Sequence, residues 1–107
     1  MIRYWLVLGV AVITEILWAL SLKYIQQHPG PWPIAASILL TATNMLLLSF
    51  AMRGIPAGVA YAVWTGLGAV GVAICGAMLF GDHLNHGQIA SMAVVIGGVV
   101  GMKLTTG

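Results

Sequence analysis

Hydrophobic residues gather in four long stretches, which short polar or proline-containing breaks separate. These stretches cover about residues 3–25, 32–52, 57–80 and 87–104. A helix needs about 20 mostly apolar residues to cross the hydrocarbon core of a membrane, and each stretch has about that length. The stretches lack the alternation of apolar and polar residues that is typical of membrane β-barrels. The pattern therefore predicts an all-α membrane protein with four transmembrane helices per chain.

The breaks contain residues that end helices. The first break has the sequence His-Pro-Gly-Pro at residues 28–31, and the second has Arg-Gly-Ile-Pro at residues 53–56. Proline cannot continue a helix, because it lacks the backbone donor and clashes with the preceding turn. The third break, residues 81–87, is the most polar run in the chain. Such short connections leave no room for a soluble unit, so we expect residues 1–107 to form one four-helix transmembrane domain.

The composition excludes several classes of function. Of the 107 residues, 61% are hydrophobic and only 6% are charged, whereas a soluble domain is about 25% charged. Four scattered cations cannot neutralise many phosphates, which argues against nucleic-acid binding. The single cysteine, Cys75, excludes an intrachain disulfide and a cysteine-based zinc cluster. We see no nucleophile–base pair within the membrane segments and expect neither an enzyme nor a metal or other cofactor.

Glu15 is the most informative residue, because it is the only acid inside an apolar stretch. An ionisable group near the bilayer centre costs at least about 2.5–3.5 kcal/mol and usually marks a functional site. Removal from water disfavours the charged carboxylate, and no buried basic residue is available as its partner. A carboxylate in this setting holds either a proton or a cation, which is the minimum needed for proton-coupled cation export. The alternative is a protonated glutamate that only hydrogen-bonds a neighbour.

Aromatic and polar residues in the first three stretches are placed to complete a cation site. Trp18 lies three residues after Glu15 and therefore on the same helix face. Indole and phenol groups can hydrogen-bond a carboxylate, and an indole face attracts cations. In the second stretch Ser37, Thr41 and Asn44 are spaced so that they lie on one face of a helix, and this polar stripe could line a wet cavity. The predicted substrate- and proton-binding residues are Glu15, Trp18, Thr41, Asn44, Tyr61 and Trp64.

The fourth stretch is better suited to assembly than to transport. It contains no charge at membrane depth, and Gly97 and Gly101 form a G-x-x-x-G pattern with Gly98 beside them. Small residues let membrane helices approach closely, so we expect these glycines at a dimer interface. One side of the membrane would carry Arg3, Arg53 and Lys103, and the other only one cation. This bias favours cytoplasmic termini.

Two motifs give the chain a resemblance to a known family. The run Thr-Glu-Ile-Leu-Trp-Ala at residues 14–19 and the run IPAGVAYAVWTGLG at residues 55–68 resemble those of the small multidrug resistance (SMR) transporters. The resemblance extends over essentially the whole chain. Within the family the chain is similar to the guanidinium exporters in Trp18, Leu22-Lys23-Tyr24, Trp64-Thr65-Gly66 and Gly101-Met102-Lys103-Leu104.

The resemblance implies a function and an assembly. It implies a proton-coupled antiporter in the bacterial inner membrane, working as an antiparallel dimer and exporting guanidinium or small substituted guanidines. Glu15 would carry proton and substrate in turn, Trp18 and Tyr61 would shape the site, and Trp64 would line it.

Two positions depart from the guanidinium exporters and keep alternatives open. Asn44 stands where those exporters usually have serine, and Val12 where they usually have glycine. The amide is larger than a hydroxyl and is also a donor, and the valine narrows the site. The alternatives are a broader exporter of quaternary ammonium or other hydrophobic cations, and one subunit of a heterodimeric SMR pair. A further alternative is a structural subunit of a larger membrane complex, in which Glu15 serves only packing.

Overall fold

The computed structural model describes residues 2–106, which form four α-helices in series. These are α1 (Ile2–Gln27), α2 (Pro31–Ala51), α3 (Ala57–Phe80) and α4 (His86–Thr105). All four are long and apolar enough to cross a membrane, which confirms the predicted all-α fold with four membrane-spanning helices. The helix ends lie within two residues of the predicted ranges. Residues 1 and 107 of the predicted domain lie outside the described range.

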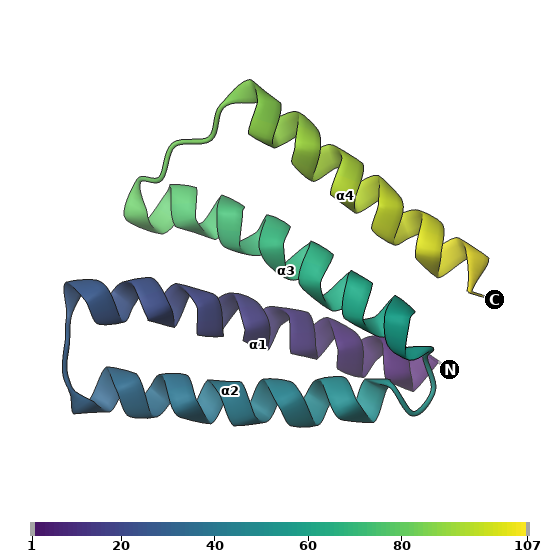
Figure 1. Cartoon of the computed structure of the whole chain (residues 1–107), viewed down its shortest axis with the longest axis horizontal. Helices are drawn as coiled ribbons and strands as arrows, with labels where there is room; N and C mark the ends of the chain where they lie inside the picture. The colour runs from purple at the N-terminus through teal and green to yellow at the C-terminus, as the bar shows by residue number, and fades with distance from the viewer. Residues whose placement is uncertain (1, 107) are drawn as a thin grey trace.

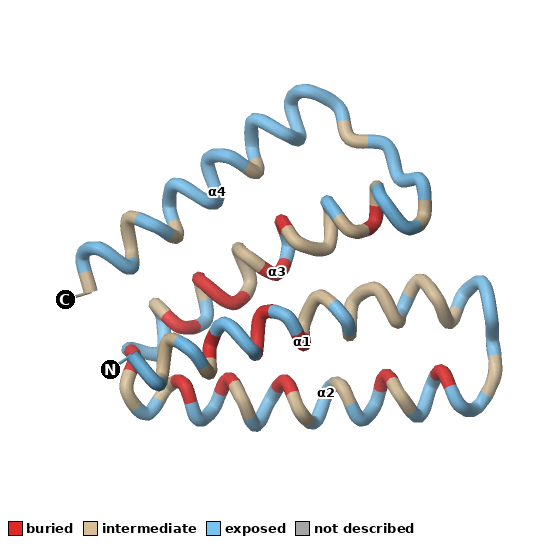
Figure 2. Tube along the Cα trace, turned by 180° about the vertical axis from the view of Figure 1, so that it is seen from behind, coloured by how far each residue is buried: buried red, intermediate tan, exposed pale blue. Residues whose placement is uncertain are grey.

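The helices are arranged around α1. Figure 1 shows α1 between α2 and α3, with α4 on the far side of α3. In the described chain the backbone of α4 lies close to α3 and not to α1 or α2, although the Lys103 side chain of α4 reaches the Trp5 ring of α1. Burial follows this arrangement. Figure 2 shows buried positions on the facing sides of α1, α2 and α3, whereas α4 is exposed along most of its length. The first three helices therefore form the packed body of the chain.

The packed body is held by small residues at the helix crossings. Ala11 on α1, Ala51 at the end of α2 and Ala60 on α3 are all 0% exposed. Close approach at small side chains is the usual way in which helices associate in lipid, where burial of apolar surface gives little drive. Leu8 and Ile55 fill the space between these contacts and are 1% and 2% exposed. This cluster lies at the end of the molecule where both termini are found (Figure 1).

The polar break between α3 and α4 has a defined local structure. Gly81 ends α3 in the left-handed region at φ 72°, which glycine adopts without strain. Asn85 caps α4, since its side chain accepts from the backbone N–H of Gln88 at 2.8 Å and the Gln88 side chain accepts from the Asn85 N–H at 3.0 Å. This reciprocal pair is a capping box. The polarity of the break thus serves to stop one helix and start the next.

An ion pair joins this break to α1. The Lys23 ammonium contacts the Asp82 carboxylate, and it also lies 5.3 Å from the centre of the Phe80 ring. The side chains of Lys23 and Asp82 are 39% and 45% exposed, so the pair sits in a wet environment at the loop end of the bundle. Lys23 is therefore engaged far from Glu15.

We expect the Lys23–Asp82 pair to contribute only about 0.2–1 kcal/mol to stability, because exposed ion pairs are screened by water and salt. A double-mutant cycle with Lys23→Ala and Asp82→Ala, read by reversible unfolding in mixed micelles, would measure the coupling energy. A coupling energy well above this range would contradict the assignment of the pair to a solvated loop.

Candidate functional site

The carboxylate of Glu15 rests against the backbone of α3. A Cβ atom added to Gly68 would overlap the Glu15 carboxyl group, with Oε2 as its nearest neighbour. Gly68 is itself buried, so there is no open space into which an added side chain could turn. Glycine at position 68 therefore creates the seat in which the Glu15 carboxyl group lies.

Three polar atoms in this region are buried without a protein partner. Within residues 2–106, no hydrogen bond reaches Glu15 Oε2, Asn44 Oδ1 or Trp64 Nε1. Leaving a buried polar group unpaired costs about 1–3 kcal/mol, and most buried polar atoms in proteins are paired. The carboxylate and the amide oxygen are acceptors, and the indole N–H is a donor. A bound cation or proton would satisfy the two acceptors, and a water molecule would satisfy an acceptor or the indole donor.

A small cavity is lined by residues about one helical turn from Glu15 on α1 and from Gly68 on α3, and neither Glu15 nor Gly68 lines it directly. It has a volume of about 50 Å³ and is lined by residues of α1, α2 and α3, namely Trp18, Thr41, Asn44, Met45 and Trp64. Trp18 follows Glu15 by about one helical turn, and Trp64 precedes Gly68 by one turn. The volume is sufficient for water or a small ion. Two indole side chains and two polar side chains thus line a space about one helical turn from Glu15.

Thr41 and Asn44, the two polar residues that line the cavity, differ in whether their hydrogen-bonding groups are free to bind a ligand. The Thr41 hydroxyl donates to the Ser37 carbonyl oxygen at 2.9 Å, so its donor is already used within α2. Asn44 is only 2% exposed and its amide oxygen is free in the described chain. Asn44 is therefore the polar group of α2 that a ligand in this cavity would meet most directly.

Tyr61 lies apart from the other predicted site residues. Its ring is 5.6 Å from that of Trp64, measured between centroids, and inclined by 49°. The residue is 54% exposed and does not line the small cavity. In a single chain, Tyr61 faces outward from α3 and contacts the site only through Trp64.

Sequence reasoning missed two contributors to this region. Gly68 was one of several glycines in the third stretch, and only the three-dimensional contact with Glu15 distinguishes it. Ser21 shares a hydrogen bond with Ser37, at 3.0 Å between the two hydroxyl oxygens. This bond joins α1 to α2 about one turn beyond Trp18. Of the polar residues on α2, Ser37 thus joins α2 to α1, and Asn44 lines the cavity.

The arrangement has the features of a carrier of small cations or protons. Residues 2–106 contain no group of three or more His, Cys, Asp or Glu side chains able to hold a metal ion. The chain instead offers four helices that are long and apolar enough to cross a membrane and, midway along α1, a carboxyl group with one buried oxygen. An ionisable residue at this depth, facing the interior of a bundle, marks ion or proton pathways. These features define the class as an integral membrane transporter.

Comparisons with known proteins identify the family. The family model described as Small Multidrug Resistance protein matches residues 3–95. A guanidinium exporter of Proteus vulgaris is 43% identical over 102 residues, covering 95% of this chain and 98% of the relative. Guanidinium exporters of Escherichia coli K12 and Yersinia pestis are 41% and 39% identical over equal lengths, covering 97% and 98% of those proteins. The chain belongs to the small multidrug resistance family and is a transporter rather than an enzyme, which confirms the family predicted from the two motifs.

Proposed function

We propose that this protein exports guanidinium in exchange for protons, and that both bind at Glu15. The main support for this proposal is the carboxylate oxygen Oε2 of Glu15, which is buried and has no hydrogen-bond partner in the described chain. The relatives named as guanidinium exporters, which are similar over nearly the full length of the chain, support the choice of substrate. The bacterial origin of these relatives supports a location in the bacterial inner membrane.

Guanidinium fits the chemistry of the site. A planar cation with a fork of N–H donors suits bidentate binding to a carboxylate. The amide oxygen of Asn44 adds a second acceptor, and the indoles of Trp18 and Trp64 offer faces that attract cations. The free Trp64 N–H can donate to the carboxylate while the cation is bound. When guanidinium leaves, a proton neutralises the carboxylate.

Competition for one carboxylate produces exchange. A protonated Glu15 has no charge with which to hold a cation, and a carboxylate bound to guanidinium disfavours protonation. If the protein changes its accessible side only when Glu15 is occupied, each guanidinium moved outward is matched by inward proton movement. The inward proton gradient of a bacterial cell would then drive export.

An antiparallel homodimer is the assembly that best completes this site. The exposed α4 carries Gly97, Gly98 and Gly101, and a Cβ atom at each would meet nothing within 4 Å. Such a surface of small residues permits close contact with another helix. A second copy would also cover the exposed Tyr61 and bring a second Glu15 near the first. A homologous partner subunit is the alternative occupant.

We expect Gly97→Leu to weaken dimer formation on the order of tenfold, because the added side chain would hold the two α4 helices apart. Single-molecule photobleaching in liposomes would measure the dimer fraction. Gly58→Leu on α3 is the matched control, since Gly58 also has open space around it but lies outside α4. Equal dimer fractions in the two variants would remove α4 from the interface.

Asn44 raises a second candidate function, the export of a broader range of cations. An amide in place of a hydroxyl changes both the size of the cavity and its hydrogen-bonding groups. If the Asn44 amide oxygen receives a guanidinium N–H in this chain, Asn44→Ser lowers guanidinium affinity about two- to tenfold, because the shorter serine side chain holds its oxygen farther from the cation and weakens one hydrogen bond. Isothermal titration would measure the change, with Thr43→Ser as a control on the same helix. Equal guanidinium affinity in both variants, with a gain for tetraalkylammonium in Asn44→Ser, would assign Asn44 to size exclusion instead.

The proposed function is tested by transport in liposomes of purified protein under an imposed pH gradient. Radiolabelled guanidinium should accumulate in the acidic lumen and should be released when a protonophore collapses the gradient. Accumulation of tetrapropylammonium as well would favour the broader exporter. Failure of both cations, followed by transport after a homologous subunit is added, would favour the heterodimer.

A further inference from the structure

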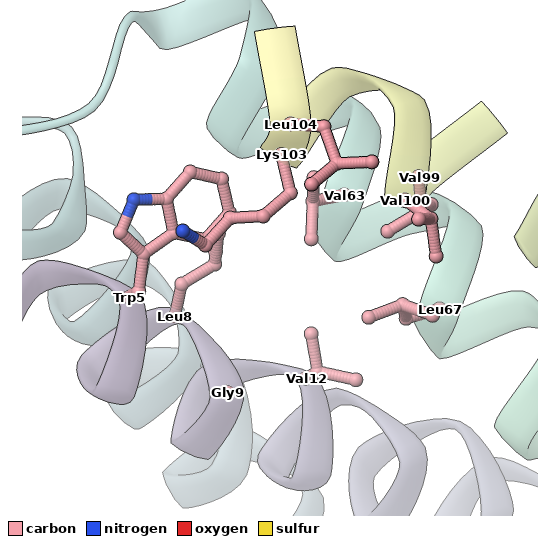
Figure 3. A pocket seen from close by; sticks show the side chains of 10 residues that line it. All are labelled: Trp5, Leu8, Gly9, Val12, Val63, Leu67, Val99, Val100, Lys103 and Leu104. Atoms are coloured by element: carbon pink, nitrogen blue, oxygen red, sulfur yellow. The ribbon is translucent and has the colours of Figure 1, made fainter. Parts of the chain in front are cut away.

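A second, larger cavity opens between α4 and the packed body of the chain. It has a volume of about 310 Å³ and lies among residues of α1, α3 and α4. Figure 3 shows Val12, Leu67 and Val99 around its inner part, and Trp5 and Lys103 toward one edge. Neither Glu15 nor Asn44 lines it. This space, called here the α4 cleft, is distinct from the small cavity at Trp18 and Asn44, and Val12, which was expected to narrow the transport site, lines the α4 cleft and not the small cavity.

The α4 cleft has the dimensions and surface of a site for a hydrocarbon chain. Its α1 wall runs from Trp5 to Val12, which is about 10 Å along the helix axis. Nearly all of its lining is aliphatic or aromatic. Gly9 forms part of this wall, and a Cβ atom there would meet nothing within 4 Å. The cleft therefore runs along α1 from near its N-terminal end toward its middle without a polar obstacle.

A positive charge stands at the mouth of the cleft. The Lys103 ammonium lies 4.6 Å from the centre of the Trp5 ring, and Lys103 is exposed. Arg3 begins α1 and Arg53 follows α2, so both are at the same end of the bundle as Lys103 (Figure 1). The only acidic side chains of the sequence are Glu15 and Asp82. Glu15 lies at mid-helix in α1, and Asp82 lies at the opposite end, paired with Lys23.

We infer that the α4 cleft binds an anionic phospholipid, with one acyl chain between α1, α3 and α4 and the phosphate against Lys103. The apolar walls match the acyl chain, and basic pockets between membrane helices bind anionic headgroups. Trp5 suits the headgroup level, where indoles gather in membrane proteins. A second copy of the chain would bring no free acidic side chain to Lys103, because Glu15 is seated against Gly68 and Asp82 is paired. The lipid supplies both an acyl chain that fits the apolar walls and a phosphate that pairs with Lys103.

The inference is tested by native mass spectrometry of the protein released from detergent with added lipid. The probes are dioleoyl phosphatidylglycerol and dioleoyl phosphatidylcholine, which share acyl chains and differ in net charge. The wild-type protein should bind phosphatidylglycerol about fivefold more tightly, the preference expected from one basic residue at the headgroup. Lys103→Gln should abolish this preference, and Lys103→Arg should keep it.

A second variant tests the cleft rather than the charge. Gly9→Leu places a side chain inside the α4 cleft and should weaken binding of both lipids. Val10→Leu, on the exposed face of α1, is the matched control and should bind as the wild type does. Equal binding of phosphatidylglycerol by the wild type, Lys103→Gln and Gly9→Leu would overturn the inference. Loss of dimers in Gly9→Leu with unchanged lipid binding would also overturn it and assign the cleft to a second copy.

Discussion

Replacing Glu15 with Gln is expected to reduce pH-driven guanidinium uptake to the background of protein-free liposomes. Glutamine is close to glutamate in size, so the side chain can still lie against Gly68. It carries no negative charge and takes up no proton in the physiological range. The variant should therefore fold and span the membrane but bind neither partner of the exchange. Radiolabelled uptake in liposomes measures the effect.

The chain provides a matched control for this experiment. Asp82 is its only other acidic residue, and it lies in the break between α3 and α4, paired with Lys23. Asp82→Asn removes the same charge outside the proposed site and should retain most of the uptake. Uptake by Glu15→Gln at the wild-type level would instead support the structural-subunit alternative, in which Glu15 serves packing alone.

Replacing Gly68 with Ala is expected to lower guanidinium uptake at least about tenfold. The added methyl group would occupy the position of the Glu15 carboxyl group, so the carboxylate must leave its seat. Displacement of a positioned group by about 1 Å can cost on the order of 100-fold in function. The pH dependence of uptake should change as well, since the surroundings of the carboxyl group change. Uptake measured over a series of lumen pH values tests both effects.

Gly71→Ala distinguishes a displaced carboxylate from a general packing defect. Gly71 lies three residues after Gly68 on α3, and its added Cβ atom would meet the Ile16 side chain rather than Glu15. Both variants crowd the α1–α3 contact, but only Gly68→Ala moves the carboxylate. An altered pH dependence in both variants alike would show that helix spacing, and not the seat of Glu15, governs the site.

Much of the fold could be predicted from sequence, because residues at the helix ends themselves determine where the helices stop. Prolines and glycines near residues 28–31 and 53–56 stop helices through their own backbone chemistry. Each predicted helix end consequently lies within two residues of the structure. The position of Glu15 midway along α1 followed in the same way from its place within an apolar stretch.

The contacts between helices could not be predicted in this way. The partner of Lys23 is Asp82, which is 59 positions away in the chain, and no local pattern links the two. Tyr61 and Trp64 are three residues apart and share a helix face, but this spacing does not show that Trp64 lines the small cavity and Tyr61 does not. The importance of Gly68 depends on which α1 side chain crosses it. These features arise from packing, which a single sequence does not specify by periodicity alone.

Proton release on substrate binding shows directly whether a proton and guanidinium compete for Glu15. Guanidinium is added to purified protein in weakly buffered detergent, and a pH-sensitive dye reports the released protons. If the two compete, the solution should acidify until guanidinium saturates the site, and Glu15→Gln should release no protons. Guanidinium binding without proton release, or equal release from Glu15→Gln, would contradict this competition.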